Sequence, residues 1–425
     1  MADPVVILGG GLTGISTALH LGPTPWVLFE KDDRLGGHAR TDLRDGFHFD
    51  KTGHWLHLRD EYTKKLIADL LPDGMARVER RAKIFSHGTL TRYPFQANLF
   101  GLPPEIIKEC LLGYLERPQN ADARDFEQYC LKHFGPGISR HFMIPYNQKL
   151  WGVHPREITA AWCDRFVPRP SLEQVVSGAV GANPPEMGYN VSFLYPKEGG
   201  IETMTKALVA RLDATRVHTR SAFDRIDPEA KTITVGGETL KWRALVASLP
   251  LPELLARMDH LPAAVEKAAS QLRCTAVQYL NVATKHSPRV DYHWIYVPEE
   301  KYPFYRVGVY TNAVPAMAPP GRGSLYVELA ARDVARVEDV LPDVVSGLVA
   351  AGALTSADDL LFADLRTIKY AYVVFDHNYY AATETIFKYL AQKNIFPRGR
   401  YGSWTYNAME DCILAGREVA QKLAA

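Results

Sequence analysis

The chain has 425 residues, 47% of them hydrophobic and 23% charged, which is the composition of an ordinary globular protein. Its length exceeds the usual size of one hydrophobic core, so we expect two or more domains. A formal net charge of +1, from 49 basic and 48 acidic residues, gives no overall field that would favour nucleic acid or an anionic membrane as a partner.

The five cysteines form no C-x-x-C pair and are odd in number. We therefore expect neither a metal site nor a disulfide framework, and a reducing, cytoplasmic location. The apolar run near the first residue is too short for a signal peptide core, and no stretch approaches the roughly 18 apolar residues of a membrane helix.

Residues 5–30 predict a buried strand, a glycine-rich turn, a helix and a second strand. Gly9, Gly11 and Gly14 fit G-x-G-x-x-G, whose glycines allow a tight turn and the close approach of a pyrophosphate. Glu30 ends the second strand about 20 residues later, where a carboxylate can bind ribose hydroxyls. The whole pattern predicts a dinucleotide site.

Residues 30–41 read EKDDRLGGHART and match E-x3-R-x-G-G-x2-R-T. This extension resembles that of FAD-dependent amine oxidases and their relatives, and it favours FAD over NAD. The resemblance assigns Lys31, Arg34, Gly36 and Gly37 to the cofactor. The alternative is an ordinary glycine loop with a solvated arginine.

The later segments alternate between helical and strand patterns. They predict helices within 104–140, a glycine turn and helix after 199, a hairpin and strand over 232–250, strands across 274–330, and helices at 337–350 and 380–392. Asn407 and Glu410 have the spacing of a capping box for a final helix.

We expect an α/β fold in which a Rossmann-like FAD-binding domain carries inserted helical and antiparallel-sheet substrate domains. The FAD-binding domain would be discontinuous and consist of residues 1–75, 195–270 and 395–425. The mainly helical insert would be residues 76–194, and the antiparallel-sheet substrate domain would be residues 271–394.

The stretch YPFQANL, residues 93–99, alternates like a strand face, and Pro94 confines such a strand to an edge or a bulge. Together with FMIPYNQKLWGVHPREITAAW, YPFYRVGVYTN and GRYGSWTYNAMED, it resembles the UDP-galactopyranose mutases, especially their eukaryotic-type branch. The likeness runs in patches along the whole chain.

That resemblance implies a nucleotide-sugar pocket in the helical insert and beside it. Tyr93, Phe95 and Gln96 would hold the uracil, Tyr146, Asn147 and Trp151 would line the nucleotide and sugar pocket, and Tyr372 and Tyr406 would contact the phosphates. Arg306 would clamp the diphosphate, since a guanidinium matches phosphate oxygens. The second phosphate arginine is Arg165 or Arg169, and we favour Arg165. The alternatives are core aromatics and solvated charges.

The same resemblance places His54 in a loop beside flavin N5, with Thr52 where the family has a glycine. Because β-branched residues resist positive φ, Thr52 puts the flipping of this loop between redox states in doubt. A loop histidine with a satisfied ring is the alternative. Arg400, Gly402, Met409 and Asp411, in the last segment, would complete the flavin site.

The implied activity is a pyranose–furanose interconversion of a nucleotide sugar, as in polysaccharide biosynthesis. The active cofactor would be reduced FAD, whose N5 forms an adduct with the sugar, and NAD(P)H or another reductant would act as a further partner. Two alternatives stay open. One is an FAD-dependent oxidase or dehydrogenase of the amine oxidase or protoporphyrinogen oxidase type, and the other is a non-catalytic flavin- or nucleotide-sugar-binding relative.

Overall fold

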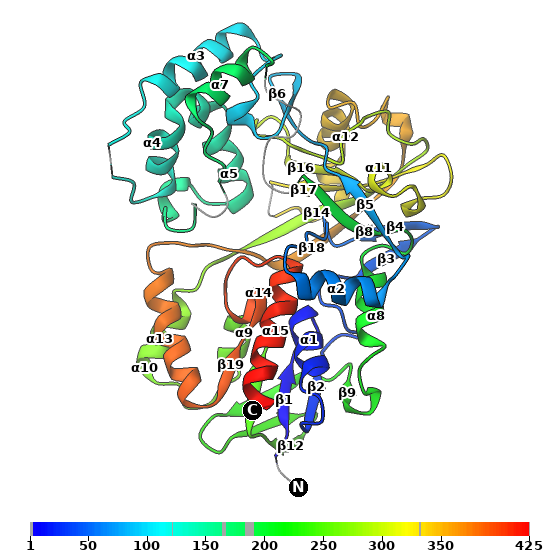
Figure 1. Ribbon diagram of the computed structural model, residues 1–425, viewed down its shortest axis with the longest axis vertical. Helices are drawn as coiled ribbons and strands as arrows, with labels where there is room; N and C mark the ends of the chain where they lie inside the picture. Colours follow the sequence, from blue (N-terminus) through cyan, green and yellow to red (C-terminus); the bar gives the residue numbers. More distant parts are fainter. Residues whose placement is uncertain (1–2, 121, 164–166, 183–190, 331–332, 425) are drawn as a thin grey trace.

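The computed structural model describes residues 3–120, 122–163, 167–182, 191–330 and 333–424. Figure 1 shows the two termini near one end of an elongated molecule and a group of helices at the opposite end, with β sheets between them. The predicted α/β class, with helical and antiparallel-sheet segments inserted into a Rossmann-like fold, is confirmed.

A five-stranded parallel sheet lies at the end of the molecule that carries the termini, in the order β19-β13-β1-β2-β9. Its strands come from the beginning, the middle and the end of the chain. They are β1 (Val5–Leu8), β2 (Trp26–Phe29), β9 (Val217–His218), β13 (Ala244–Ala247) and β19 (Ile395–Pro397). Strands β1 and β13 are buried along their whole length, as expected for a parallel sheet covered on both faces.

Helices and a second small sheet cover these strands. Ser16 Oγ in α1 donates to the main-chain oxygen of Ile413 in α15 at 2.6 Å, and a Cβ added at Gly416 would lie 2.5 Å from Thr13 O, so the two helices pack closely. The elements are α1 (Leu12–His20), α8 (Glu202–Val209), α9 (Leu251–Leu255), α10 (Ala263–Ser270), α13 (Tyr379–Gln392), α14 (Gly399–Gly402), α15 (Met409–Ala424), and the antiparallel strands β10 (Phe223–Asp227), β11 (Thr232–Val235) and β12 (Glu238–Lys241).

A seven-stranded sheet crosses the middle of the molecule, in the order β18-β14-β17-β16-β15-β6-β7. All neighbours pair antiparallel except β15 and β6, which pair parallel. The strands are β6 (Ala82–Ser86), β7 (Thr89–Arg92), β14 (Cys274–Thr284), β15 (Trp294–Tyr296), β16 (Phe304–Val309), β17 (Gly323–Leu329) and β18 (Leu360–Val373).

Smaller elements lie beside these two sheets. They are the pairs β3 (Thr41–Arg44) with β4 (Phe47–Asp50) and β5 (Met75–Glu79) with β8 (Ser192–Pro196), and the helices α2 (Glu61–Leu70), α11 (Tyr310–Ala313) and α12 (Leu341–Ala350).

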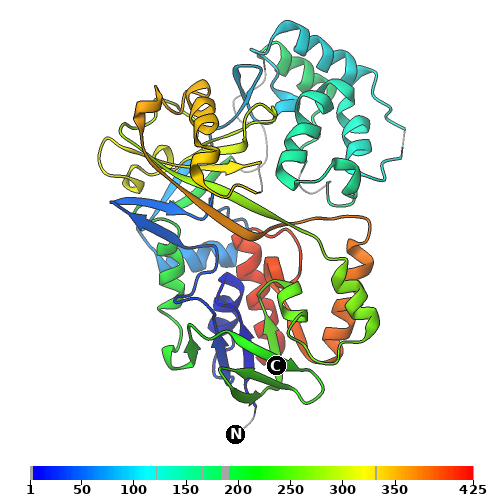
Figure 2. The ribbon, with the colours of Figure 1, turned by 180° about the vertical axis from the view of Figure 1, so that it is seen from behind.

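Helices at the far end of the molecule form a separate layer (Figure 2). Glycines bring two of them into backbone contact, because a Cβ added at Gly135 would lie 1.9 Å from Gly113 O. The helices are α3 (Pro104–Leu115), α4 (Phe126–Ile138), α5 (Ile144–Trp151) and α7 (Leu172–Ala179). Among the helices in the described ranges, none has the length and apolar character that crossing a bilayer requires.

Residues 93–99 alternate like a strand face, but they do not form a strand. Strand β7, at the edge of the seven-stranded sheet, ends at Arg92, and Phe95–Ala97 form a 3-10 turn. Pro94 has no N–H to extend the ladder, so the chain leaves the sheet here.

The predicted capping box of the last helix is also wrong. The box was assigned to Asn407 and Glu410, but the side chain that closes the start of α15 is Asp411, which accepts the main-chain N–H of Ala408 at 2.8 Å. Glu410 is buried and accepts the main-chain N–H groups of residues 59 and 60, at 2.7 and 2.9 Å. Its carboxylate therefore satisfies donors at the start of α2 rather than of its own helix.

Candidate functional site

The glycine turn after β1 leaves main-chain N–H groups open at the start of α1. Gly9 has a φ of +94°, and a Cβ added at Gly14 would lie 2.0 Å from Gly9 O, so neither position tolerates a side chain. Gly11 is the N-cap residue, makes no side-chain cap and would meet nothing within 4 Å of an added Cβ. The turn is thus a concave, donor-rich surface of the kind that binds phosphate.

The Glu30 side chain stabilises this turn through hydrogen bonds. Its buried carboxylate accepts the main-chain N–H of Gly10 at 2.7 Å and that of Asp32 at 2.8 Å. Lys31, next to it, is exposed and lies 4.0 Å from Glu253. The position of Glu30 after β2 agrees with a ribose-binding acid, and that role stays a prediction.

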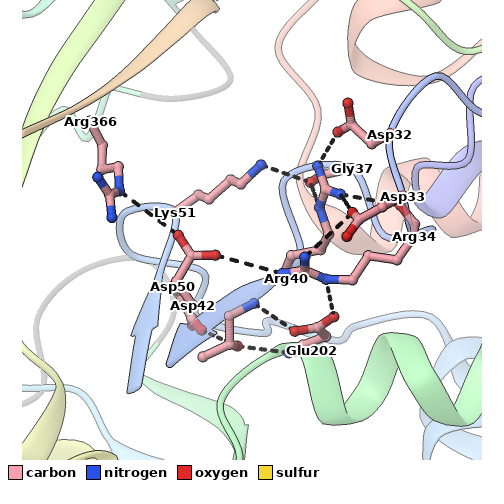
Figure 3. A network of polar contacts seen from close by, with 11 residues as sticks. Asp32, Asp33, Arg34, Gly37, Arg40, Asp42, Asp50, Lys51, Glu202 and Arg366 are labelled. Atoms are coloured by element: carbon pink, nitrogen blue, oxygen red, sulfur yellow. Dashed lines mark hydrogen bonds and ion pairs between the residues drawn. The ribbon is translucent and has the colours of Figure 1, made fainter. Parts of the chain in front are cut away.

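The loop that follows is held by a network of charges (Figure 3). Arg34 donates from Nε to Glu202 in α8 at 2.8 Å and lies 3.6 Å from Asp42. A Cβ added at Gly37, whose φ is +58°, would lie 3.1 Å from Gly11 Cα, so this loop packs directly on the phosphate-type turn. Gly36, at φ +122°, also requires glycine. Arg34 therefore fixes the loop against α8 in this structure.

The loop that contains His54 adopts a strained conformation. Thr52 has a φ of +68°, which a β-branched residue rarely adopts. Tyr310 holds it there by donating to the main-chain oxygens of Asp50 at 3.1 Å and Thr52 at 3.0 Å. Burial lowers the pKa of His54 to about 4, so its imidazole is neutral at neutral pH.

Arg306 forms the polar centre of the seven-stranded sheet. Its Nη2 donates to both oxygens of Glu328, at 2.7 and 2.6 Å, and to the Tyr372 hydroxyl at 2.9 Å. The Glu328 side chain is 1% exposed and that of Arg306 21% exposed. Within the described residues, Arg306 Nε is buried without a hydrogen-bond partner, which leaves a donor that a bound anion could use.

Aromatic side chains and a second arginine lie beside this pair. The Tyr372 and Tyr406 rings are parallel within 8° and 6.4 Å apart, and the Arg400 guanidinium lies 4.6 Å from the Tyr406 ring centre. Arg400 donates to the main-chain oxygens of Asn407 and Ala371, at 2.9 and 2.8 Å. The final segment is thereby joined to β18.

Helix α5 adds an aromatic wall beside these residues. The Tyr146 ring lies 5.3 Å from that of Tyr296 and 6.2 Å from that of Tyr305, the neighbour of Arg306. Trp151 is buried edge-on against Tyr372 at 5.7 Å, and within the described part of the chain its indole N–H has no hydrogen-bond partner. The Asn147 side chain donates to the main-chain oxygen of Met143, four residues earlier in the chain, at 2.7 Å.

The three residues predicted to hold the base separate into two environments. Tyr93 is half-buried, with its ring 5.2 Å from that of Tyr296, and so joins the same aromatic wall. Phe95 is 0% exposed and stacks on Phe142 at 5.0 Å, while Gln96 donates to Pro168 O at 2.8 Å. Phe95 and Gln96 thus pack in the helical layer, and their contact with a base stays a prediction.

The remaining predicted residues are the two candidate phosphate arginines and the residues near the C-terminal helix. Arg165 lies outside the described residues, and Arg169 is exposed. A Cβ added at Gly402 would lie 2.2 Å from Ala247 O, so this glycine lets α14 touch β13. Met409 is the first residue of α15, and Asp411 closes its first turn.

Sequence reasoning missed several polar residues of this region. Glu328 is the partner of Arg306, and its signal was a carboxylate inside the apolar run SLYVELA. Asp50 is buried beneath the Thr52 loop, where burial raises the pKa of its carboxyl to about 7. His38 follows Gly37, and its buried Nδ1 has no partner among the described residues. Lys149 stands inside the PYNQKLWG motif.

Comparisons with known proteins agree with this geometry. A model of the flavin containing amine oxidoreductase family matches residues 12–424. A solved structure of reduced UDP-galactopyranose mutase superposes with a TM-score of 0.94 at 26% identity, over 100% of this chain and 94% of that chain. The predicted resemblance to UDP-galactopyranose mutase-like flavoproteins is therefore confirmed.

One more distant structure shares the fold, and one more distant protein is similar in sequence. A putative protoporphyrinogen oxidase from Exiguobacterium sp. 255-15 superposes with a TM-score of 0.76 at 15% identity, over 100% of this chain and 99% of that chain. The 4,4'-diaponeurosporene oxygenase of Staphylococcus aureus (strain USA300) is 22% identical over 356 residues, 74% of this chain and 70% of that protein.

Proposed function

The chain belongs to the flavin containing amine oxidoreductase family, and on that premise we propose that it is a flavin-dependent nucleotide-sugar mutase. The reaction would interconvert the pyranose and furanose forms of a sugar such as that of UDP-galactose. The observation that carries the proposal is the Arg306 centre, a cation that donates to Glu328 and to the Tyr372 hydroxyl, with the Trp151 ring packed against Tyr372. It is supported by the likeness to a UDP-galactopyranose mutase structure along the whole chain.

The family implies a flavin cofactor, and the residues around the glycine turn fit one. The unobstructed Cα of Gly11 and the uncapped start of α1 suit a pyrophosphate, with Glu30 near the ribose. The buried Nδ1 of His38, which has no partner among the described residues, leaves a polar atom for a ligand beside the second loop. Reduced flavin, when bound, supplies the nucleophile for the anomeric carbon, which the side chains of the site do not offer.

The side chains of this chain would bind and orient the substrate. Arg306 would use Nε, which has no partner within the described residues, on the diphosphate, and its charge would stabilise the negative charge that develops on the leaving nucleotide. Tyr372 and Tyr406 would offer hydroxyls to the phosphates, with Arg165 or Arg169 as a second cation. The indole N–H of Trp151 would donate to a sugar hydroxyl. Neutral His54 would hold or accept a proton near the cofactor.

A titration with UDP tests this proposal against the oxidase alternative. We expect the holoprotein reduced by dithionite to bind UDP more tightly than the oxidised form. NAD(P)H or another donor would supply the electrons in the cell. Rapid reoxidation in air with no affinity for UDP would instead identify an oxidase. Binding of UDP without conversion of UDP-galactose would identify a binding protein.

A further inference from the structure

Lys149, in α5, places its ammonium group in a cage of main-chain oxygens. Nζ lies 3.1 Å from Val297 O, 2.8 Å from Glu299 O, 2.9 Å from Tyr302 O and 2.6 Å from Phe304 O. The residue is buried, which is rare for lysine. Its methylene chain crosses from the helical layer to the seven-stranded sheet.

Three of the four oxygens belong to the connection 297–303 between β15 and β16, and the fourth belongs to Phe304, the first residue of β16. This connection turns its carbonyl groups inward, where buried acceptors require donors. An ammonium group offers three protons that can be shared among them, and it is compact enough to be approached from several sides. Lys149 therefore supplies donors to these oxygens, of which Glu299 O also accepts the main-chain N–H of Tyr302 at 3.3 Å.

The two elements that the lysine joins both carry residues of the proposed nucleotide-sugar site. On α5, Tyr146 and Trp151 lie three residues before and two residues after Lys149. On the hairpin, Tyr296 pairs with Arg306 in register across β15 and β16. The ring of Tyr146 meets the ring of Tyr296 at 5.3 Å, directly beside the cage.

We propose that Lys149 is a positioning residue that sets the distance between the α5 wall and the Arg306 strand, and thereby the affinity for the nucleotide diphosphate. The inference rests on the proposed function. Lys149 does not touch the substrate in this scheme. It acts through four carbonyl groups on the hairpin that holds Arg306.

The surroundings of Lys149 act on its charge in both directions. Burial lowers the pKa of Lys149 to about 7, and the carboxylates of Glu299 and Glu300 act in the opposite direction. Four carbonyl oxygens within hydrogen-bond distance further favour the ammonium form.

The test compares flavin-loaded wild-type protein with Lys149→Met, which is one atom shorter, keeps an unbranched side chain and removes its donors. Lys301→Met is the matched control, because Lys301 is an exposed lysine of the same connection, 3.3 Å from Glu299. Hydrogen exchange is measured over 144–151 and 297–309, and UDP affinity is measured on the reduced protein.

We expect Lys149→Met to exchange faster in these two segments only, to bind UDP about tenfold or more weakly, and to keep the flavin spectrum of the wild type. The KM for the nucleotide sugar should rise while kcat at saturation stays within about twofold, and Lys301→Met should match the wild type. If Lys149→Met does not fold, Lys149→Gln serves with the same expectations, since it removes the charge and one donor.

Unchanged UDP affinity in either flavin-loaded Lys149 variant would overturn the inference. So would a loss of thermal stability or flavin content without any change in the UDP affinity of the loaded fraction. Failure of the wild type itself to bind UDP would overturn the proposed function as well, so the two failures are distinguishable.

Discussion

Arg306 and Glu328 lie opposite each other on β16 and β17, with Arg306 Nη2 at 2.7 and 2.6 Å from the two carboxylate oxygens. The carboxylate is buried, so its charge is compensated mainly by this one guanidinium. In the ligand-free protein, Glu328 therefore holds the Arg306 guanidinium in one orientation beside the sheet. A bound diphosphate would add a second anionic partner to the same arginine.

Glu328→Gln should therefore destabilise the ligand-free protein. Removing one partner of a buried ion pair costs about 3 kcal/mol, because the remaining charge loses its compensation. UDP should stabilise this variant more than the wild type, since the diphosphate restores a counter-charge. Chemical denaturation with and without UDP measures both effects.

The control for this prediction is Asp364→Asn. Asp364 pairs with Arg44 at an exposed position, where an ion pair contributes about 1 kcal/mol or less. Equal stabilisation of the wild type and Glu328→Gln by UDP would contradict the assignment of Arg306 to the diphosphate.

Trp151→Phe should weaken binding of the nucleotide sugar without destabilising the fold. The indole N–H has no partner within the described residues, and such a buried donor costs about 1–3 kcal/mol while it is unsatisfied. Phenylalanine keeps the apolar contact with Tyr372 and removes the N–H. We expect unchanged or higher thermal stability and a KM raised about tenfold. A KM like that of the wild type would assign Trp151 to packing alone.

Thr52→Gly should leave the free energy of unfolding unchanged or raise it by up to about 1 kcal/mol, because a β-branched residue at φ +68° is strained. Glycine accepts this φ, although its greater unfolded-state entropy offsets part of the gain. Thr234→Gly in strand β11 is the control and should destabilise by about 1 kcal/mol. Equal losses in urea denaturation of both variants would contradict the strain.

Asp50→Asn should change the pH dependence of stability. The pKa of Asp50 is raised to about 7 in the folded protein, so between about pH 4 and 7 the folded state holds a proton that the unfolded state has lost. The contribution of Asp50 to stability is therefore full below pH 4 and is lost as the pH rises through 7. Asparagine does not titrate, so Asp50→Asn does not lose this contribution. The Tm of Asp50→Asn minus the Tm of the wild type should therefore rise from pH 4 to 7 and level off above pH 7.

The asparagine can replace the carboxyl because Thr41 Oγ1 and the Ile201 N–H both donate to Oδ1, at 2.6 and 3.2 Å, and the Tyr195 hydroxyl at Oδ2 can accept as well as donate. A Tm difference that is constant from pH 4 to 8 would show that Asp50 does not titrate in this range.

Local patterns predicted the parts of the fold that depend on neighbouring residues. The spacing of Gly9, Gly11 and Gly14 and the position of Glu30 were readable because turn, helix and strand lie within 30 residues. The resemblance of PYNQKLWG and YPFYRVGVY to mutase motifs located Trp151 and Arg306, which the fold then brings to the same region through Tyr372.

Features that depend on distant contacts were not predictable. The Arg306–Glu328 pair requires the register of two strands, and burial of Phe95 requires its stacking on Phe142. Glu410 has the spacing of a cap for its own helix, yet it accepts N–H groups at the start of α2, about 350 residues earlier in the chain. Local spacing alone cannot distinguish these outcomes.

The most direct test of the mutase proposal is product analysis by NMR. Flavin-loaded, prereduced protein is incubated without oxygen with UDP-galactopyranose, beside Arg306→Ala and the control Arg44→Ala. We predict that wild type and Arg44→Ala form the furanose isomer with no net consumption of reducing equivalents, and that flavin-loaded Arg306→Ala forms none. An oxidised sugar product, or isomer formation by Arg306→Ala at the wild-type rate, would contradict the account.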